Sequence, residues 1–505
     1  MAKSQGLLQK RFISVGHLGL WFVCGLMTPY VSFAYEPLGH QSDLQPERPP
    51  VDLAKEQLRI GDRLWTSGDK AAARHYYRTA KPAFDEQTTG EILEPTSDVA
   101  ALSPGGRVYW RNAQEGLEQG LTQKTLISLD LLVAESPHFI PGRIVQIQQL
   151  LAADNVEGAT AALGNALSGY GRSTELMTYA IEFYHQTEQW LAASLAARQF
   201  ALLHPEHPQQ EEFTALADEY WEEYQSDLRA EIRGNTFANF ITGAVGFVLT
   251  GSLVGPITAL ESSVLLLQGE EAVGNRISEN IQEVAPMLED ETVLTYVREM
   301  GDRLTTFVGQ DRFNYEFYVI LNEELNAFAL PGGKIFLYAG AILAARSEAE
   351  LAGLLSHEIA HAALSHGFQL VTEGNLTANI TSTLPFGRIA GSLIVMNHSR
   401  EMERQADALG TQILAASPYA ADGLYNLTVT LGNDEGRDVP PTWLSTHPGI
   451  EERVENIKTQ IVGQNYDRYT FEGISRHEEI QGIVRQLMAA EETRLAEDAT
   501  EREND

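Results

Sequence analysis

Apolar side chains recur at three- and four-residue intervals through most of residues 50–230. This spacing places them on one face of an α-helix, so we expect a series of amphipathic helices there. Residues 85–106 interrupt the series with glycine, proline and small polar residues, which predict a loop or linker. The N-terminal half of the chain is therefore expected to be helical.

Turn residues divide this helical region at equal intervals. Pro137, Gly171 and Pro205 recur every 34 residues. The region resembles tetratricopeptide repeats, in which helix pairs of that period stack into a solenoid. An earlier pair is expected at 52–82, with its turn at Gly68-Asp69. The concave surface of such a solenoid would bind a client or an envelope partner protein, although a helical spacer without a ligand would show the same pattern.

Two other stretches carry almost no charge. Residues 235–260 contain no charged side chain, and 376–396 contain only Arg388. The first is long enough for a membrane-spanning helix, but its glycines and Pro256 equally favour a membrane-dipping hairpin or a buried helix pair within 235–268. The second could be a lid or a membrane-facing loop. Either stretch could make a peripheral membrane contact.

The C-terminal half contains two helices with recognisable ends. Ser347-Glu348-Ala349-Glu350 is a capping box before the apolar positions of 351–363, and Gly367 is expected to end that helix. A second helix is expected to begin after Ser399 and to end at Ser417-Pro418. The candidate functional residues of the chain lie on these two helices.

A small sheet is expected just before the first of these helices. Residues 317–321 and 334–338 are rich in β-branched and aromatic side chains, with Pro331-Gly332-Gly333 as the turn between them. At the end of the chain, 466–505 should be a helix and an acidic tail, frayed from Glu491 onwards. The predicted fold is mainly α: a helical solenoid followed by an α+β domain with a small sheet.

The first 34 residues have the features of a secretory signal. Three basic residues precede a charge-free apolar core, and Ser32-Phe33-Ala34 offers small residues to a signal peptidase. Without cleavage, residues 1–34 would form an N-terminal anchor. Cleavage would remove Cys24, the only cysteine, so disulfides would not stabilise the remaining chain. We expect an exported protein of the bacterial periplasm or cell envelope.

The charge balance limits the partners. The formal net charge is −33, from 36 basic and 69 acidic residues, and it becomes −36 once the three basic residues of the signal are removed. So acidic a surface argues against nucleic acid as a partner and against electrostatic docking on anionic lipid. It favours solubility and basic or unfolded protein clients.

The most specific chemistry lies in His357-Glu358-Ile359-Ala360-His361. Two imidazoles four residues apart share one face of a helix, where a tetrahedral zinc ion can accept a nitrogen from each. Glu358 is placed to take a proton from a zinc-bound water. A catalytic zinc also needs a third protein ligand and one open position. The motif lies inside the first expected helix, as this geometry requires.

The second expected helix offers the remaining ligand. Glu403 and Asp407 are four residues apart and share a helical face. One carboxylate could bind the metal while the other orients an imidazole. A solvated helix whose charges pair locally would show the same spacing.

Taken together, these motifs resemble the gluzincin family of BepA-like and HtpX-like zinc metallopeptidases. HEIAH at 357–361 and EMERQAD at 401–407 match its HExxH and ExxxD motifs. Upstream, 326–333 (NAFALPGG) is similar to its NAF-x-PGG segment, and downstream 446–448 (THP) is similar to its histidine-proline loop. The resemblance covers about Glu270 to Val462 and implies a zincin-type metallopeptidase domain at 270–465.

The resemblance implies a role for each matching residue. His357, His361 and Glu403 would hold one zinc ion per chain, and Glu358 would be the general base. Asp407 would orient a ligand imidazole. In some relatives a histidine in the loop that carries His447 approaches the metal and blocks it, whereas a turn histidine before proline would look the same in sequence.

Further assignments stay open at this level. His447 or Arg453 could donate to the oxyanion of the reaction. Asn326 and Phe328 lie where an exposed edge strand could bind an extended peptide, although a hairpin that only packs the core is the alternative. Two nearby histidines are interpreted as structural or solvent-facing: His366 and His398.

Three functions are compatible with these observations. The leading hypothesis is a zinc endopeptidase that cleaves envelope or misassembled client proteins recruited by the repeat region. The second is a chaperone-like repeat scaffold whose peptidase is normally shut, by His447 for example. The third, an integral membrane protease resembling prenyl-protein endopeptidases, is disfavoured because the usual set of strong transmembrane helices is absent from the sequence.

Overall fold

The computed structural model describes residues 51–81, 83–84, 94–233, 265–308, 313–372, 398–432, 443 and 446–504. The predicted signal segment and both uncharged stretches, 235–260 and 376–396, lie outside these described residues. None of the described helices combines the length and the apolar character that a membrane crossing needs. The described chain is mainly helical with one three-stranded sheet, which confirms the predicted fold class.

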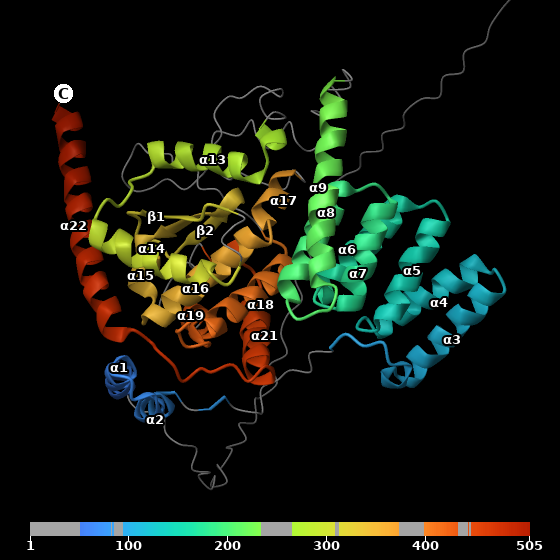
Figure 1. The fold of residues 1–505 in the computed structure, drawn as a ribbon, viewed down its shortest axis with the longest axis horizontal. Coiled ribbons are helices and arrows are strands. Elements are labelled where there is room, and N and C mark those ends of the chain that lie inside the picture. Colours follow the sequence, from blue (N-terminus) through green and yellow to red (C-terminus); the bar gives the residue numbers. More distant parts are fainter. Residues whose placement is uncertain are drawn as a thin grey trace, which may run out of the picture. The chain divides into compact units, whose positions relative to one another are not determined.

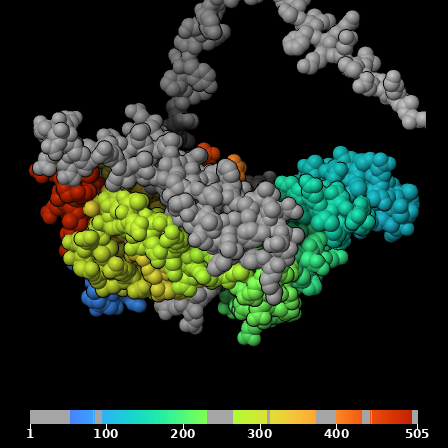
Figure 2. Space-filling model, turned by 90° about the horizontal axis from the view of Figure 1, so that it is seen from above, coloured from blue at the N-terminus to red at the C-terminus, as the bar shows by residue number. Residues whose placement is uncertain are grey.

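Consecutive helices pack against one another through the predicted repeat region (Figure 1). Figure 2 shows the surface of this region coloured from cyan to green in the order of the sequence. Ala159 and Ala193, which are 34 residues apart, are both fully buried at helix contacts. Small residues at such positions allow the helix backbones to approach closely. The helices of this region are α3 (Pro104–Glu118), α4 (Thr122–Glu135), α5 (Ile140–Ala152), α6 (Val156–Tyr170), α7 (Thr174–Gln186), α8 (Trp190–Leu203) and α9 (Gln210–Arg233).

The predicted loop at 85–106 is wrong at its C-terminal end. Ser103 caps α3, because its Oγ accepts the Gly106 N–H at 2.9 Å, and Pro104 opens the helix. Proline has a suitable φ for the first helical position and its missing N–H is not needed there. The sequence Ser103-Pro104-Gly105-Gly106, which was predicted to be part of a loop, is therefore the start of a helix. A short 3-10 helix, η2 (Val99–Ala101), precedes it.

The helix pair expected at 52–82 is present, but it docks on the C-terminal segment. Its members are α1 (Val51–Thr66) and α2 (Lys70–Ala80), joined at Gly68 with a φ of 92°. Figure 1 shows the pair beside the N-terminal end of α22 (Ile474–Asn504), and Arg59 forms an ion pair with Glu478 at 2.7 Å.

Buried charges hold this pair in place. The Asp62 carboxylate accepts the backbone N–H groups of Glu472 and Ile474, each at 2.9 Å. The Lys81 ammonium donates to Asp422 at 2.8 Å and also to Glu472. Since every carboxylate has a donor, the charges can be buried together. We call the following residues the anchor cluster: Asp62, Tyr77, Lys81, Asp422, Arg468 and Glu472.

The sheet has the strand order β1-β3-β2. The expected strands appear as β1 (Glu316–Ile320) and β3 (Lys334–Tyr338), but they pair in parallel. The turn at 331–333 instead joins β3 to the antiparallel strand β2 (Ala327–Leu330), which contains Phe328 of the expected substrate strand. The predicted hairpin partner was wrong because β2 is buried on both faces and so lacks the alternation of polar and apolar residues that marks a half-exposed strand.

Helices cover both faces of the sheet (Figure 1). On one face Phe336 belongs to the same buried cluster as Val273 of α13 (Glu270–Val284). On the other face Leu337 belongs to the cluster that contains α14 (Glu291–Thr305) and α16 (Glu348–Ala363). Successive strand residues point to opposite faces, which explains this division.

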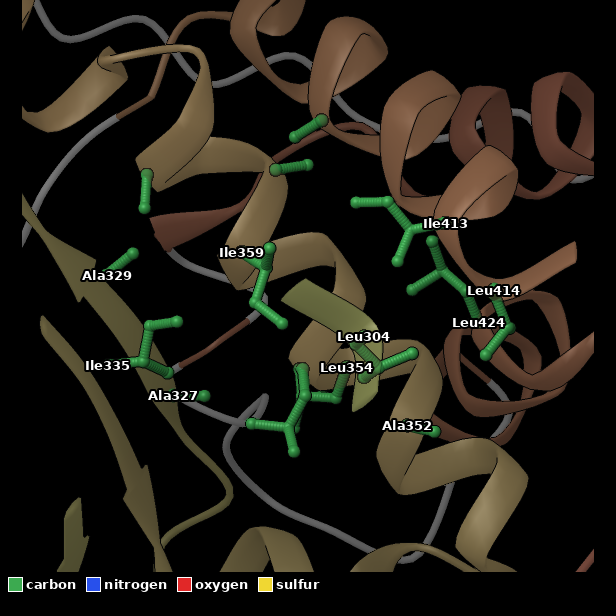
Figure 3. Packing of buried hydrophobic residues seen from close by; sticks show 14 of the residues in the cluster. Leu304, Ala327, Ala329, Ile335, Ala352, Leu354, Ile359, Ile413, Leu414 and Leu424 are labelled. Atoms are coloured by element: carbon green, nitrogen blue, oxygen red, sulfur yellow. The ribbon is translucent and has the colours of Figure 1, made fainter. Parts of the chain in front are cut away.

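Helix α16 lies at the centre of the larger cluster. Figure 3 shows Ile359 of α16 near Ala329 and Ile335 of the sheet, with Ile413 and Leu414 from the next layer of helices. The remaining helices are α15 (Ala339–Ala344), α17 (His366–Thr372), α18 (Arg400–Ala416), α19 (Gly423–Gly432) and α21 (Ile450–Gly463), and a short 3-10 turn, η3 (Pro331–Gly333), links β2 to β3.

The predicted frayed tail is helical instead, because α22 continues to Asn504. Its last turns contain many good helix formers, and Arg494 pairs with Glu491 at 2.6 Å one turn earlier. The charge density that suggested fraying therefore also supports a helix.

Helix α8 of the predicted repeat region contacts the turn that follows α16. The Gln199 side chain donates to the carbonyl oxygen of Leu364 at 3.3 Å, and Arg198 donates to Ser365 Oγ at 3.4 Å. Helices α6 and α8 also pack against α18. The predicted repeat region thus contacts α18 and the turn that follows α16.

Candidate metal centre

Helix α16 positions His357, Glu358 and His361, all of them buried. Ser347 caps the helix by accepting the Glu350 N–H at 3.1 Å, so half of the predicted capping box is present. The Glu350 carboxylate instead accepts the Arg346 N–H at 2.8 Å. Capping and burial on all sides fix the helix against the sheet, which fixes the two imidazoles.

The helix ends earlier than predicted. Its last residue is Ala363, and Ser365 follows with a φ of 59°. Gly367, the predicted stop, lies inside α17. A left-handed backbone at a residue other than glycine is uncommon and often marks a functional position. Here it turns the chain so that the next residue, His366, faces back towards α16.

Helix α18 brings the predicted carboxylates to the same place. Ser399 caps it by accepting the Met402 N–H at 3.2 Å, and the helix ends at Ala416, just before Ser417-Pro418 as predicted. Glu403 and Asp407, four residues apart, are both buried beside α16. The solvated charged helix that was the alternative for this stretch is therefore wrong.

Four side chains converge on one point. His357, His361, Glu403 and His447 each offer one donor atom, and these atoms all lie within 4.8 Å of one another. The Nε2 atoms of His357 and His361 are 3.1 Å apart, and His361 Nε2 is 3.4 Å from Glu403 Oε1. His447 Nδ1 lies 3.3 Å from His357 Nε2 and 2.9 Å from Glu403 Oε1.

Asp407 and Arg453 support this group. Asp407 Oδ1 is 3.0 Å from His357 Nδ1. Arg453 binds Asp407 through two nitrogens, at 2.8 and 2.7 Å, and its third nitrogen lies 3.1 Å from Glu403 Oε2. Although burial raises the pKa of Asp407, the Arg453 guanidinium outweighs it and the net pKa is lowered. Arg453 therefore favours the ionised form of Asp407.

The electrostatics keep Glu403 and His361 in states that can bind a cation, but they favour the protonated form of His447. Burial alone would raise the pKa of Glu403, but the charges of His447 and Arg453 hold it well below its ordinary value. Burial holds the pKa of His361 well below its ordinary value, so this imidazole is neutral. For His447 burial lowers the pKa, but Glu403 and Glu358 outweigh it and raise the net value.

Glu358 is partnered by a tryptophan that the sequence analysis missed. Trp443 Nε1 donates to Glu358 Oε1 at 3.1 Å, and the indole stacks on His447 with ring centroids 4.9 Å apart. Within the described part of the chain, Glu358 Oε2 has no hydrogen-bond partner. The only sequence signal was a large aromatic residue four positions before His447.

His366 and His398 do not face solvent as the sequence analysis allowed, because both are buried against the four converging residues. His366 Nδ1 lies 2.9 Å from His361 Nδ1, and its Nε2 lies 2.9 Å from Gln405 Oε1. The His398 ring centroid is 3.9 Å from that of His361, and Nδ1 is 3.7 Å from Glu403 Oε1. In the sequence, the spacing of five residues between His361 and His366 was the feature that could have indicated their proximity.

The predicted substrate strand is placed differently. β2 is an edge strand of the sheet, but all four of its residues are buried, so the expected exposure is wrong. Phe328 stacks on Phe336 at 5.2 Å between centroids, on the face opposite α16. The backbone carbonyl oxygen of Asn326 accepts the Tyr338 N–H at 2.9 Å. The structure does not bring these two side chains to the converging donors.

Comparisons with known proteins agree with this geometry. Residues 292–461 match the model of Peptidase family M48, a range that contains every converging residue. The chain is 26% identical over 236 residues to the beta-barrel assembly-enhancing protease of Yersinia pestis, covering 43% of this chain and 48% of that protein. It is 27% identical over 187 residues to the mitochondrial metalloendopeptidase OMA1 of Schizosaccharomyces pombe, covering 35% and 55%.

A third relative, the beta-barrel assembly-enhancing protease of Escherichia coli, is 25% identical over 219 residues, which are 39% of this chain and 45% of that protein. The chain spans about half the length of these relatives. Family match, relatives and buried histidine–glutamate group all concern the same segment, and residues 292–461 therefore form a domain of peptidase family M48.

Proposed function

We propose that this protein is a zinc-dependent endopeptidase that hydrolyses internal peptide bonds of client proteins. The observation that carries the proposal is the convergence of His357, His361 and Glu403 from two separate helices. The family match and the endopeptidase names of the relatives support it. The peptidase domain would extend somewhat beyond the matched range, over 270–465.

The spacing of the donor atoms fits zinc. Ligands about 2.05 Å from a tetrahedral zinc ion stand about 3.3 Å from one another. The separations between His357 Nε2, His361 Nε2 and Glu403 oxygens are 3.1, 3.4 and 3.6 Å. Imidazole nitrogen and carboxylate oxygen are both ordinary zinc donors, and zinc would supply a Lewis acid at the scissile carbonyl and acidify the attacking water. We propose one such ion per chain.

The protein's own groups would then divide the remaining work. Glu358 accepts a proton from the attacking water through its free Oε2 and returns one to the leaving amine. Asp407 holds the His357 ring with Nε2 towards the metal. Arg453 is committed to Asp407 and Glu403, so we assign it to holding those carboxylates and leave the donor to the oxyanion as a role for His447.

One observation favours the second candidate, a scaffold whose peptidase is normally shut. His447 Nδ1 belongs to the same group of donors, at 3.3 Å from His357 Nε2. Four protein donors leave no open position on a tetrahedral zinc, which is the arrangement of a structural site. In this state His447 would block the metal, and the peptidase would act only after the loop that carries it moves away.

Metal content and cleavage of casein test both candidates. We expect about one zinc per chain in the wild type and its loss in Glu403→Ala, while Glu358→Gln keeps the zinc and loses cleavage. Wild type without stoichiometric metal would overturn the proposal. If His447→Ala cleaves faster than wild type, His447 is a block; if it cleaves more slowly, His447 assists the reaction.

We further propose where the enzyme works. The signal-like first 34 residues suggest export to the bacterial periplasm or envelope, where the repeat helices would recruit envelope or misassembled proteins as clients. Contacts of α8 with the turn after α16 support a client site close to the metal. Crosslinking clients to the repeat region in intact cells tests the recruitment, and loss of crosslinks after deletion of 104–203 is expected.

A further inference from the structure

The two ligand imidazoles are held by different partners. His357 directs Nδ1 to the Asp407 carboxylate at 3.0 Å. His361 directs Nδ1 to the ring of His366, with the two Nδ1 atoms 2.9 Å apart. His366 in turn directs Nε2 to Gln405 Oε1 at 2.9 Å. A histidine and a glutamine thus occupy, for His361, the place that a carboxylate occupies for His357.

The direction of each hydrogen bond in this chain follows from one condition. A ligand nitrogen carries no proton, so a neutral His361 that offers Nε2 to the metal must carry its proton on Nδ1. That N–H can only donate, and His366 Nδ1 must accept. His366 then carries its own proton on Nε2, which donates to the carbonyl oxygen of the Gln405 side chain. With this assignment, each of the two hydrogen bonds joins one donor to one acceptor.

The fold keeps this chain of hydrogen bonds in register. His366 is fully buried and Gln405 is 6% exposed, so water does not compete for the bonds. The left-handed Ser365 turns His366 back onto α16, and Ser365 Oγ donates to Glu270 Oε2 at 2.9 Å. Gln405 stands between Glu403 and Asp407 on α18. Helix α18 therefore supplies both a metal donor and Gln405, while His366 comes from α17, which begins three residues after the end of α16.

We propose that His366 and Gln405 are positioning residues that fix the tautomer and ring orientation of His361 for metal binding. The proposal rests on the proposed zinc function. Outer partners of ligand histidines fix the ring and raise its basicity, and their loss typically weakens metal binding about 10–100-fold. A histidine that only filled space would need neither a defined proton direction nor an acceptor at Gln405.

Zinc affinity, measured by competition with a chromogenic chelator, tests the proposal. We expect His366→Phe to weaken binding by roughly 10–100-fold, and Gln405→Leu by about fivefold, the effect of one lost hydrogen bond. Gln405→Glu keeps an acceptor and should bind zinc at least as tightly as wild type. A packing role predicts the reverse order for the two Gln405 variants, because leucine suits a buried position better than a carboxylate.

Matched controls separate this effect from folding. His477 and Gln481 are also buried and hydrogen-bonded, to Tyr296 and to backbone carbonyls, outside the metal centre. His477→Phe and Gln481→Leu should lower the denaturant midpoint of the metal-free protein but leave zinc affinity within twofold of wild type.

Two outcomes overturn the proposal: unchanged affinity in His366→Phe, or weaker binding in Gln405→Glu than in Gln405→Leu. Asp407→Asn distinguishes these failures from failure of the zinc function. If wild type binds zinc and Asp407→Asn weakens binding while His366→Phe does not, only the positioning role is lost. If wild type binds no zinc, the proposed function itself is wrong.

Discussion

The metal centre and the anchor cluster both contain several buried ionisable groups, but they balance their charges differently. In the anchor cluster each carboxylate faces a donor: Asp62 faces two backbone N–H groups, and Asp422 lies between Lys81 and Arg468. In the metal centre the acceptor atoms of His357, His361 and Glu403 face one another at 3.1–3.6 Å.

This difference indicates that the anchor cluster connects two segments of the chain, whereas the metal centre is a binding site. Buried charges that complete one another cost little net free energy and hold two segments together. Buried acceptors that face one another are unfavourable unless a cation binds between them. The anchor cluster is therefore expected to affect stability without zinc, whereas the metal centre is expected to make stability depend on zinc.

The largest effect is expected from Lys81→Met. Removal of the ammonium leaves Asp422 and Glu472 buried with fewer donors, which should lower the free energy of unfolding by about 3–5 kcal/mol. Urea denaturation of the zinc-free protein measures it. Lys124 pairs with Glu115 at the surface, and Lys124→Met should cost at most about 1 kcal/mol. Equal losses in the two variants would contradict the comparison.

Zinc removal should give the next largest effect. At free zinc about a thousandfold above the dissociation constant, binding stabilises the folded state by about 4 kcal/mol. Chelation should remove this stabilisation in wild type and in Lys81→Met. The stability of Glu403→Ala should be the same with and without the chelator, because this variant does not bind zinc. Denaturation midpoints with and without chelator provide the measurement. A zinc-dependent shift that survives in Glu403→Ala would place the ion elsewhere.

The anchor cluster should also respond to pH. Burial raises the pKa of Glu472 to about 7 even though Lys81 lowers it, whereas the unfolded side chain titrates near 4.5. Between these values the folded state holds a proton that the unfolded state has lost, so stability falls as pH rises, by about 3 kcal/mol in all. Glu472→Gln should flatten this slope in urea denaturation at pH 4.5–7, and an unchanged slope would assign it to other groups.

A smaller effect is expected from Asp62→Asn. The amide keeps one acceptor and turns an NH2 group towards a backbone N–H of Glu472 or Ile474, which should cost about 1–3 kcal/mol. Thermal or urea unfolding measures it. Asp69 caps α2 at the surface, where asparagine caps about as well, so Asp69→Asn should be close to neutral. Similar losses in both variants would mean that the charge, rather than burial, matters.

Several parts of the site could be predicted from the sequence because they depend on local geometry. His357 and His361 lie on adjacent turns of one helix, and Glu403 and Asp407 share a face for the same reason. The helix starts at Ser347 and Ser399 followed from capping chemistry. The family resemblance then connected these two helices, and the structure brings them together.

Other parts could not be predicted because they depend on contacts between distant segments. Nothing in the strand sequences distinguished a hairpin of β1 with β3 from the observed parallel pair with β2 inserted at the edge. His366 reaches His361 only because Ser365 takes a left-handed conformation. Gln405 and Trp443 gained their partners only through the packing of α18 and of the His447 loop against α16.

The sequence by itself determined the helices, their caps and the pairs of donor residues, because residues three or four positions apart on a helix meet without help from the rest of the chain. Only the tertiary structure decided which distant groups complete the metal centre, where the first helix pair docks and which strands are neighbours. Those outcomes depend on burying charges and apolar faces against segments far away in the chain, and local spacing carries no information about them.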